Sequence, residues 1–149
     1  GIWFSPLAIA AGACDGLGMG TNARAALVTR GLSEMARLGV ALGGDPLTFM
    51  GLSGVGDLIL TTTGALSRNR SLGLKVAEGV DPATYLASQR AVAEGYLTAK
   101  AAYQLALKHS VDVPITEQVY HVLHEGRPLF DAMKQLLTRA QKEELWGIR

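Results

Sequence analysis

The stretch Leu7-Ala8-Ile9-Ala10-Ala11-Gly12-Ala13-Cys14, residues 7–14, decides between two folds. If it is a strand, the following residues 18–23, Gly-Met-Gly-Thr-Asn-Ala, fit the G-x-G-x-x-G/A pattern of a phosphate-binding turn. Residues 40–42 then supply a second strand, and Asp45 supplies an acid for a ribose. However, four of the eight residues in 7–14 are alanine and one is β-branched, which favours a helix. No later segment supplies the other parallel strands. The glycines at 16–20 are therefore interpreted as a turn between two helices.

The hydrophobic pattern of the segments that follow this stretch is also helical. Residues 22–42 carry the apolar stripe Leu27, Gly31, Met35 and Leu38 at helical spacing. The β-branched run at 58–63 is a weak strand signal, because it has no second run to pair with. The sequence predicts an all-α domain of about six to eight helices.

Helix boundaries are marked by proline, aspartate and glycine. Asp45-Pro46 and Asp81-Pro82 are typical helix starts, and Gly126 is a typical stop. Residues 91–109 form a long amphipathic helix candidate with Leu97, Ala101, Leu105 and Lys108 at helical intervals. After Pro114 the expected apolar face is Val119, Val122 and Leu123, and after Pro128 the expected inward-facing residues are Phe130, Met133, Leu136 and Leu137. The polar tail, 139–149, is expected to fray.

Composition excludes several classes of protein. The 149 residues are 48% apolar and 18% charged, which argues against disorder. A net charge of +1 gives no electrostatic footprint for nucleic acid or an anionic membrane. The one cysteine, Cys14, forms no internal disulfide and suits a reducing compartment. With no apolar run of about 18 residues and no secretory signal, the chain is expected to be cytoplasmic.

The most suggestive polar cluster is Ser67-Arg68-Asn69-Arg70. Ser67 is expected to cap a helix whose first amides and dipole favour an anion. Arg68 adds a fork of donors that matches phosphate geometry, and Asn69 adds a neutral donor. A capped, solvated helix start is the equally weighted alternative.

Two carboxylates and several aromatic side chains are further candidates. Asp57 is either a helix cap or an acid that orients a catalytic lysine or histidine, and Glu94 is interpreted as a complement to a helix dipole. His121 and His124 have no carboxylate ligands arranged around them, so no metal site is expected. Three tyrosines are expected to be partly buried with polar tips: Tyr96, Tyr103 and Tyr120.

Several short motifs occur in a specific order. They are Ala8–Gly12, Asp15–Gly18, Asn22–Leu27, Thr29–Leu32, Glu34-Met35, Leu42–Phe49, Gly54–Leu58, Thr63-Gly64, Leu66–Arg70, Val92–Gly95 and Pro114–Glu117. In this order they resemble bacterial NAD(P)-dependent glycerol-3-phosphate dehydrogenases over 7–138. The resemblance implies the helical, C-terminal substrate domain, with a fold similar to the 6-phosphogluconate dehydrogenase C-terminal domain. It also implies that a separate N-terminal domain binds most of the NAD or NADP.

The resemblance implies roles for individual residues. Asp57 falls on the family's active-site aspartate, which binds substrate and orients the catalytic lysine. Ser67, Arg68 and Asn69 fall on residues that bind glycerol 3-phosphate or dihydroxyacetone phosphate, and Arg68 also touches the cofactor. The remaining cofactor contacts fall on Val92 and Glu94. A homodimer is a further expected assembly, and a non-catalytic helical dimerisation or interaction module is the alternative function.

One departure from the family concerns its proton-transferring lysine. The lysine position here is Phe4 and the next is Ser5, so Ser5-Pro6 is expected to begin the helix as cap and first residue. A phenyl ring transfers no proton. Either residues 1–6 are foreign to this position, which is the favoured interpretation, or the protein has lost its acid–base group. In both cases this chain alone is expected not to turn over.

Overall fold

The fold is built from helices throughout the part of the chain that the computed structural model describes, residues 4–45, 64–86 and 90–147. Within those ranges there are seven helices and no strand. They are α1 (Ser5–Gly16), α2 (Thr21–Ala41), α5 (Gly64–Ala77), α6 (Pro82–Leu86), α7 (Arg90–Lys108), α8 (Pro114–Glu125) and α9 (Leu129–Gly147). The predicted all-α class is confirmed. Pro46 and the run at 58–63 lie outside the described residues.

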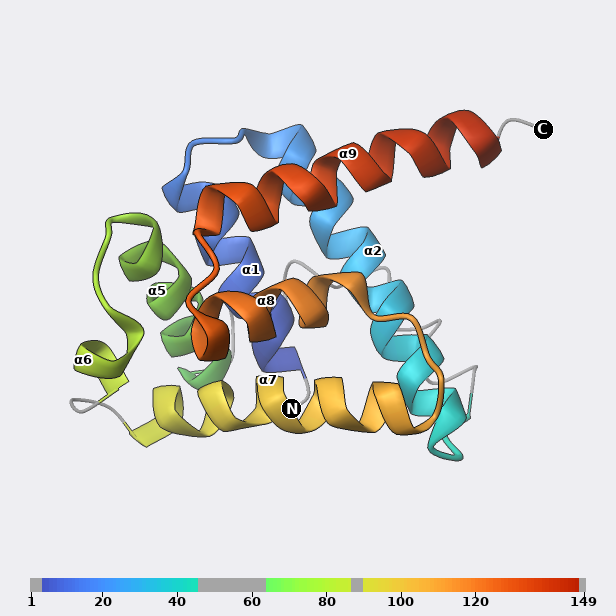
Figure 1. Ribbon diagram of the computed structural model, residues 1–149, viewed down its shortest axis with the longest axis horizontal. Coiled ribbons are helices and arrows are strands. Elements are labelled where there is room, and N and C mark those ends of the chain that lie inside the picture. Colours follow the sequence, from blue (N-terminus) through green and yellow to red (C-terminus); the bar gives the residue numbers. More distant parts are fainter. Residues whose placement is uncertain (1–3, 46–63, 87–89, 148–149) are drawn as a thin grey trace.

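Helix α1 is the centre of the domain. Every residue from Ser5 to Cys14 is buried, because a helix that is apolar on all sides must be covered all round. Helices α2, α5, α7 and α8 pack on it, and Figure 1 shows α1 between α5 and α2. The stretch at 7–14 is therefore a helix, as its alanine content predicts.

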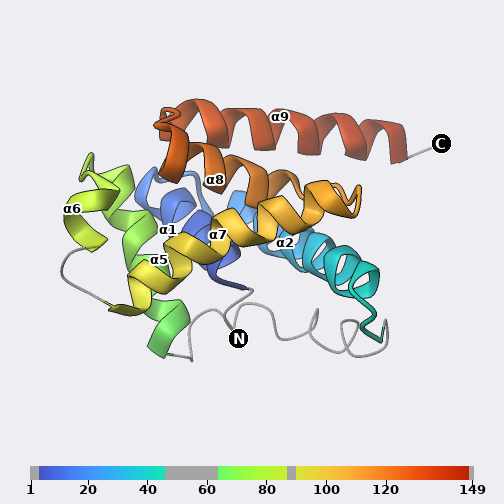
Figure 2. The ribbon, with the colours of Figure 1, turned by 60° about the horizontal axis from the view of Figure 1, so that its bottom comes forward.

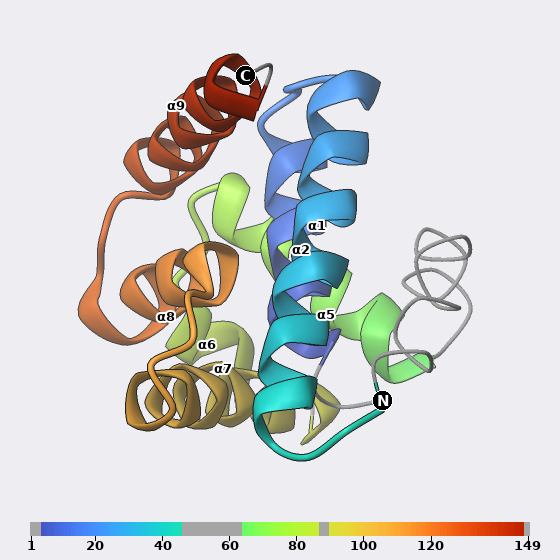
Figure 3. The same cartoon turned by 90° about the vertical axis from the view of Figure 1, so that its right-hand side faces the viewer.

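The turn after α1 confirms the interpretation of the glycine cluster. Gly18 and Gly20 have φ values of +66° and +94°, a conformation that suits residues without a side chain. The turn reverses the chain, so that α2 returns beside α1 (Figure 3). The G-x-G-x-x-A segment thus joins two helices and not a strand and a helix.

Helices α1 and α5 approach each other until their backbones touch. A Cβ atom added to Gly73 would fall 2.0 Å from the carbonyl oxygen of Ile9 and 2.7 Å from the amide nitrogen of Ala13. A Cβ added to Gly12 would fall 1.9 Å from the carbonyl oxygen of Arg70. These two glycines therefore set the distance between the helices, and this distance fixes the position of residues 67–70.

A buried acid joins α2 to α8. Glu34, only 1% exposed, accepts hydrogen bonds from the backbone N–H groups of Ile115 (2.8 Å) and Thr116 (3.0 Å). These donors belong to the first turn of α8 and have no partner within that helix. The N-cap residue Val113 offers no side-chain bond, so Glu34 performs the capping from another helix. Burial raises the pKa of Glu34 to about 7, and the two N–H bonds work against that rise.

The C-terminal helices form an outer layer. Gly126 ends α8 in the left-handed conformation (φ +70°, ψ +20°), as predicted, and α9 then lies over α8 (Figure 2). Met133 is buried on the inner side of α9, whereas Phe130 is 60% exposed, so its expected inward orientation is wrong. The helix continues past Arg139 to Gly147, and the expected fraying of this tail stays a prediction.

The buried face of α7 differs from the predicted one. The predicted stripe began at Leu97, but Leu97 is 62% exposed, and Ala101 and Lys108 are also exposed. The fully buried positions are Ala99, Ala102 and Ala106. Helix α7 packs through small side chains that let its neighbours come close. The prediction missed this face because a hydrophobicity pattern ranks alanine below leucine.

The start of α1 also differs from expectation. Ser5 is the first helical residue and is buried, whereas Phe4 is the N-cap and no side chain caps the helix. Ser5 is therefore not the cap that the sequence predicted. At the start of α6, by contrast, Asp81 Oδ1 accepts a bond from the N–H of Ala83 (3.2 Å), which confirms the predicted Asp81 cap. Among the described helices, none is long and apolar enough to cross a bilayer.

Candidate functional site

The polar cluster Ser67–Asn69 lies on α5, near its first turn. The helix begins at Gly64, so Ser67 lies inside it and is not its cap, contrary to the prediction. The carbonyl oxygen of Ser67 accepts a bond from Ser71 Oγ (3.2 Å) within the helix. Ser67 and Arg68 are exposed, so a hydroxyl and a guanidinium face outward from adjacent positions.

Asn69 faces the opposite way and meets α7. It is 1% exposed, and a Cβ atom added to Gly95 would fall 1.9 Å from Asn69 Oδ1 and 2.6 Å from its Cγ. The carboxamide therefore lies directly over the backbone of Gly95. Glu94 precedes Gly95 in α7. It is exposed, and its carbonyl oxygen accepts a bond from Thr98 Oγ1 (2.8 Å).

The remaining predicted site residues are placed only in part. Asp57 lies outside the described residues, and Val92 is placed as backbone of α7. Phe4 is partly buried and packs against both apolar clusters of the core; that it stands at a lysine position stays a prediction. The structure thus places Asn69 in contact with Gly95, the residue that follows Glu94.

A charged network behind the cluster was missed by sequence reasoning. Asp15 Oδ2, at the end of α1, lies 2.8 Å from Arg70 Nη2 and 3.3 Å from Arg24 Nε. All three side chains are partly buried, with exposed fractions of 19–34%. The network joins α1, α2 and α5, so Arg70 anchors α5 to the core. The sequence signal that could have indicated this network was Asp15, the one acid at the end of an otherwise apolar helix.

The aromatic side chains pack between α7 and α8. Tyr96 donates to the carbonyl oxygen of Leu123 (3.2 Å), and its ring lies 3.9 Å from that of His124, centroid to centroid. Tyr103 and Tyr120 are in ring contact at 4.7 Å. The predicted partly buried tyrosines with polar tips are confirmed. In the described ranges, no group of three or more potential ligands is placed to hold a metal ion.

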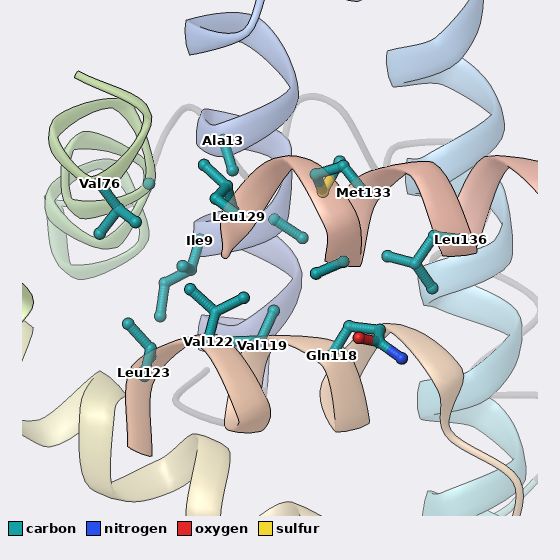
Figure 4. A pocket seen from close by; sticks show the side chains of 13 residues that line it. Ile9, Ala13, Val76, Gln118, Val119, Val122, Leu123, Leu129, Met133 and Leu136 are labelled. Carbon is teal, nitrogen blue, oxygen red and sulfur yellow. The ribbon is translucent and has the colours of Figure 1, made fainter. Parts of the chain in front are cut away.

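A small cavity lies between α1, α5, α8 and α9 (Figure 4). Its volume is about 20 Å³, and Ile9, Val119 and Met133 are among the mostly apolar side chains that line it. A cavity of this size and polarity holds at most one water molecule. It is therefore a packing feature of the core and does not suit a charged, three-carbon ligand.

Comparison with known proteins places this arrangement in a family. The family model described as "NAD-dependent glycerol-3-phosphate dehydrogenase C-terminus" matches residues 5–134. Proteins named glycerol-3-phosphate dehydrogenase [NAD(P)+] are similar to the chain at 55% identity over 140 residues in Geobacter sulfurreducens and 57% over 138 in Nitratidesulfovibrio vulgaris. The aligned residues cover 94% and 93% of the chain, but only 42% of each of these relatives.

A crystal structure gives the same correspondence in three dimensions. The glycerol-3-phosphate dehydrogenase of Coxiella burnetii superposes with a TM-score of 0.79 at 46% identity. The match covers 92% of the chain and 42% of that structure. The chain therefore spans about two fifths of the length of the relatives it matches.

Proposed function

This chain belongs to the C-terminal family of NAD-dependent glycerol-3-phosphate dehydrogenases, and from that membership we propose that it forms a substrate domain. The proposed reaction interconverts dihydroxyacetone phosphate and sn-glycerol 3-phosphate. The observation that carries the proposal is the position of Arg68, which is exposed beside Ser67 and next to Asn69, itself in contact with Gly95. A guanidinium and a hydroxyl exposed at adjacent positions of one helical turn are suited to a phosphate ester.

The proposed mechanism divides the work among these groups. Arg68 binds the phosphate through its planar fork, with Ser67 as a further polar contact, and so holds the three-carbon substrate in one orientation. Asn69, the third residue proposed for substrate binding, is buried against Gly95 and supports this turn of α5. Asp57 is proposed as the acid that orients the proton-transferring group. Glu94 is proposed as a cofactor contact, because it is exposed and precedes Gly95, the residue that Asn69 contacts.

Cofactor binding is proposed for Arg68, Val92 and Glu94, and a separate N-terminal domain is proposed to hold most of NAD or NADP. When bound, the nicotinamide supplies the hydride that the reaction requires. The proposed setting is the cytoplasm. A homodimer is proposed as well, and Leu97 and Leu107, each 62% exposed on α7, offer apolar surface for one.

We expect Arg68→Ala to weaken binding of glycerol 3-phosphate about tenfold or more, because a charged hydrogen bond to the phosphate is lost. Isothermal titration of glycerol 3-phosphate into the purified chain measures this. Lys108→Ala, which removes an exposed charge at the far end of α7, is the matched control and leaves the affinity unchanged. Equal affinities for the chain and its Arg68→Ala variant would count against the proposal.

We expect the purified chain to show no turnover of dihydroxyacetone phosphate with NADH or NADPH. Phe4 stands at the position of the proton-transferring lysine, and its side chain is a partly buried hydrocarbon ring. The absorbance of the reduced cofactor, followed with and without substrate, reports the reaction. A substrate-dependent loss of absorbance by the pure chain would contradict this expectation.

A further inference from the structure

We propose that Gly95 is a positioning residue for the phosphate-binding segment of α5. The absence of a side chain at this position lets the carboxamide of Asn69 lie in the contact between α5 and α7. That contact sets where Arg68 and Ser67 stand relative to Glu94. The inference rests on the proposed function for its meaning in substrate binding, but its geometry is independent of that function.

A glycine at position 95 has an energetic cost for the helix. Gly95 lies inside α7, where glycine is less favourable than alanine because its backbone loses more conformational freedom on folding. Its φ is not among the positive values found in the chain, so backbone conformation does not require a glycine. What requires it is space, since the Asn69 carboxamide occupies the volume that a Cβ atom would fill, 1.9 Å from Oδ1 and 2.9 Å from Nδ2.

Arg70, which follows Asn69 in α5, is fixed independently of this contact. Arg70 Nη2 bonds to Asp15 Oδ2 at 2.8 Å, and the carbonyl oxygen of Arg70 lies where a side chain on Gly12 would be. Residue 70 is thus anchored to α1, and residue 69 to α7. A helix held at two adjacent positions by two different partners does not rotate freely about its axis. Arg68 is therefore presented to solvent in one direction.

The test adds one methyl group to α7. Gly95→Ala is expected to displace the carboxamide, lower the melting temperature, and shift the backbone amide NMR signals of Ser67 and Arg68. Under conditions in which the variant is folded, its affinity for glycerol 3-phosphate is expected to fall about tenfold or more. Ala101→Ser also adds one heavy atom to α7, at an exposed position, and is the matched control. It is expected to lower the melting temperature only slightly, through helix propensity, and to leave the Ser67 and Arg68 signals and the affinity unchanged.

A double-mutant cycle separates positioning from simple overpacking. Without the carboxamide there is room for the methyl group, so Gly95→Ala in an Asn69→Ala background is expected to leave the melting temperature unchanged or raise it. An equal loss in both backgrounds, or unshifted Ser67 and Arg68 signals in Gly95→Ala, would overturn the inference. If Arg68→Ala leaves glycerol 3-phosphate binding unaltered, the proposed function fails, while the coupling of Gly95 to Asn69 is still decided by the cycle.

Discussion

Replacing Gly73 with alanine is expected to destabilise the fold by about 3 kcal/mol or more, a large part of the 5–15 kcal/mol typical of a domain. The added Cβ atom would lie 2.0 Å from the carbonyl oxygen of Ile9 and 2.7 Å from the amide nitrogen of Ala13. Both obstacles are backbone atoms of the central helix α1, so no side-chain rotation relieves the collision. The gain in helix propensity, about 1 kcal/mol, is too small to offset it.

Urea denaturation followed by circular dichroism measures this loss as a lower midpoint. Gly79→Ala is the control, because nothing lies within 4 Å of the added atom and only its φ of +91° opposes the change. That variant is expected to lose about 1 kcal/mol, the cost of a left-handed conformation. A Gly73→Ala midpoint equal to that of the unchanged protein would show that α1 and α5 are not in backbone contact.

The second large effect is a loss of stability as the pH rises from 4.5 to 7. Burial raises the pKa of Glu34 from 4.5 to about 7 in the folded chain. Between these values the folded state keeps a proton that the unfolded state releases. The stabilisation from this group is therefore complete below pH 4.5 and is lost as the pH approaches 7. The expected loss is on the order of 3 kcal/mol.

Glu34→Gln isolates this contribution, because glutamine does not titrate and its oxygen still accepts one of the two bonds from Ile115 and Thr116. The free energy of unfolding is measured for both proteins at several pH values, and the difference between them is expected to change across this window. A constant difference would mean that Glu34 has the same pKa in the folded and unfolded chain.

Local signals in the sequence predicted most of the helices. The stripe containing Leu27 and Met35 belongs to α2, and both residues are buried. The cap by Asp81 and the stop at Gly126 also occur where they were expected. These features depend on residues close together in the chain, which is why one sequence suffices to find them.

Features that depend on contacts between distant helices were not predictable. Leu97 was expected inside, yet alanines form the buried face of α7, because close packing there matters more than hydrophobicity. The bonds of Glu34 to α8 join residues 81 and 82 positions apart. The cluster at 67–69 was proposed as an anion site from residue types alone. The contact of Asn69 with Gly95 links two helices whose separation no local pattern encodes.

The central place of α1 has a consequence for how the protein is made. Its ten buried residues leave the ribosome first among the helices described, whereas α5, α7 and α8, which cover it, follow about 50 to 110 residues later. At a synthesis rate of roughly 5–20 residues per second, α1 is complete several seconds before these three helices. Part of the apolar surface of α1 is therefore expected to stay uncovered until α8 has emerged.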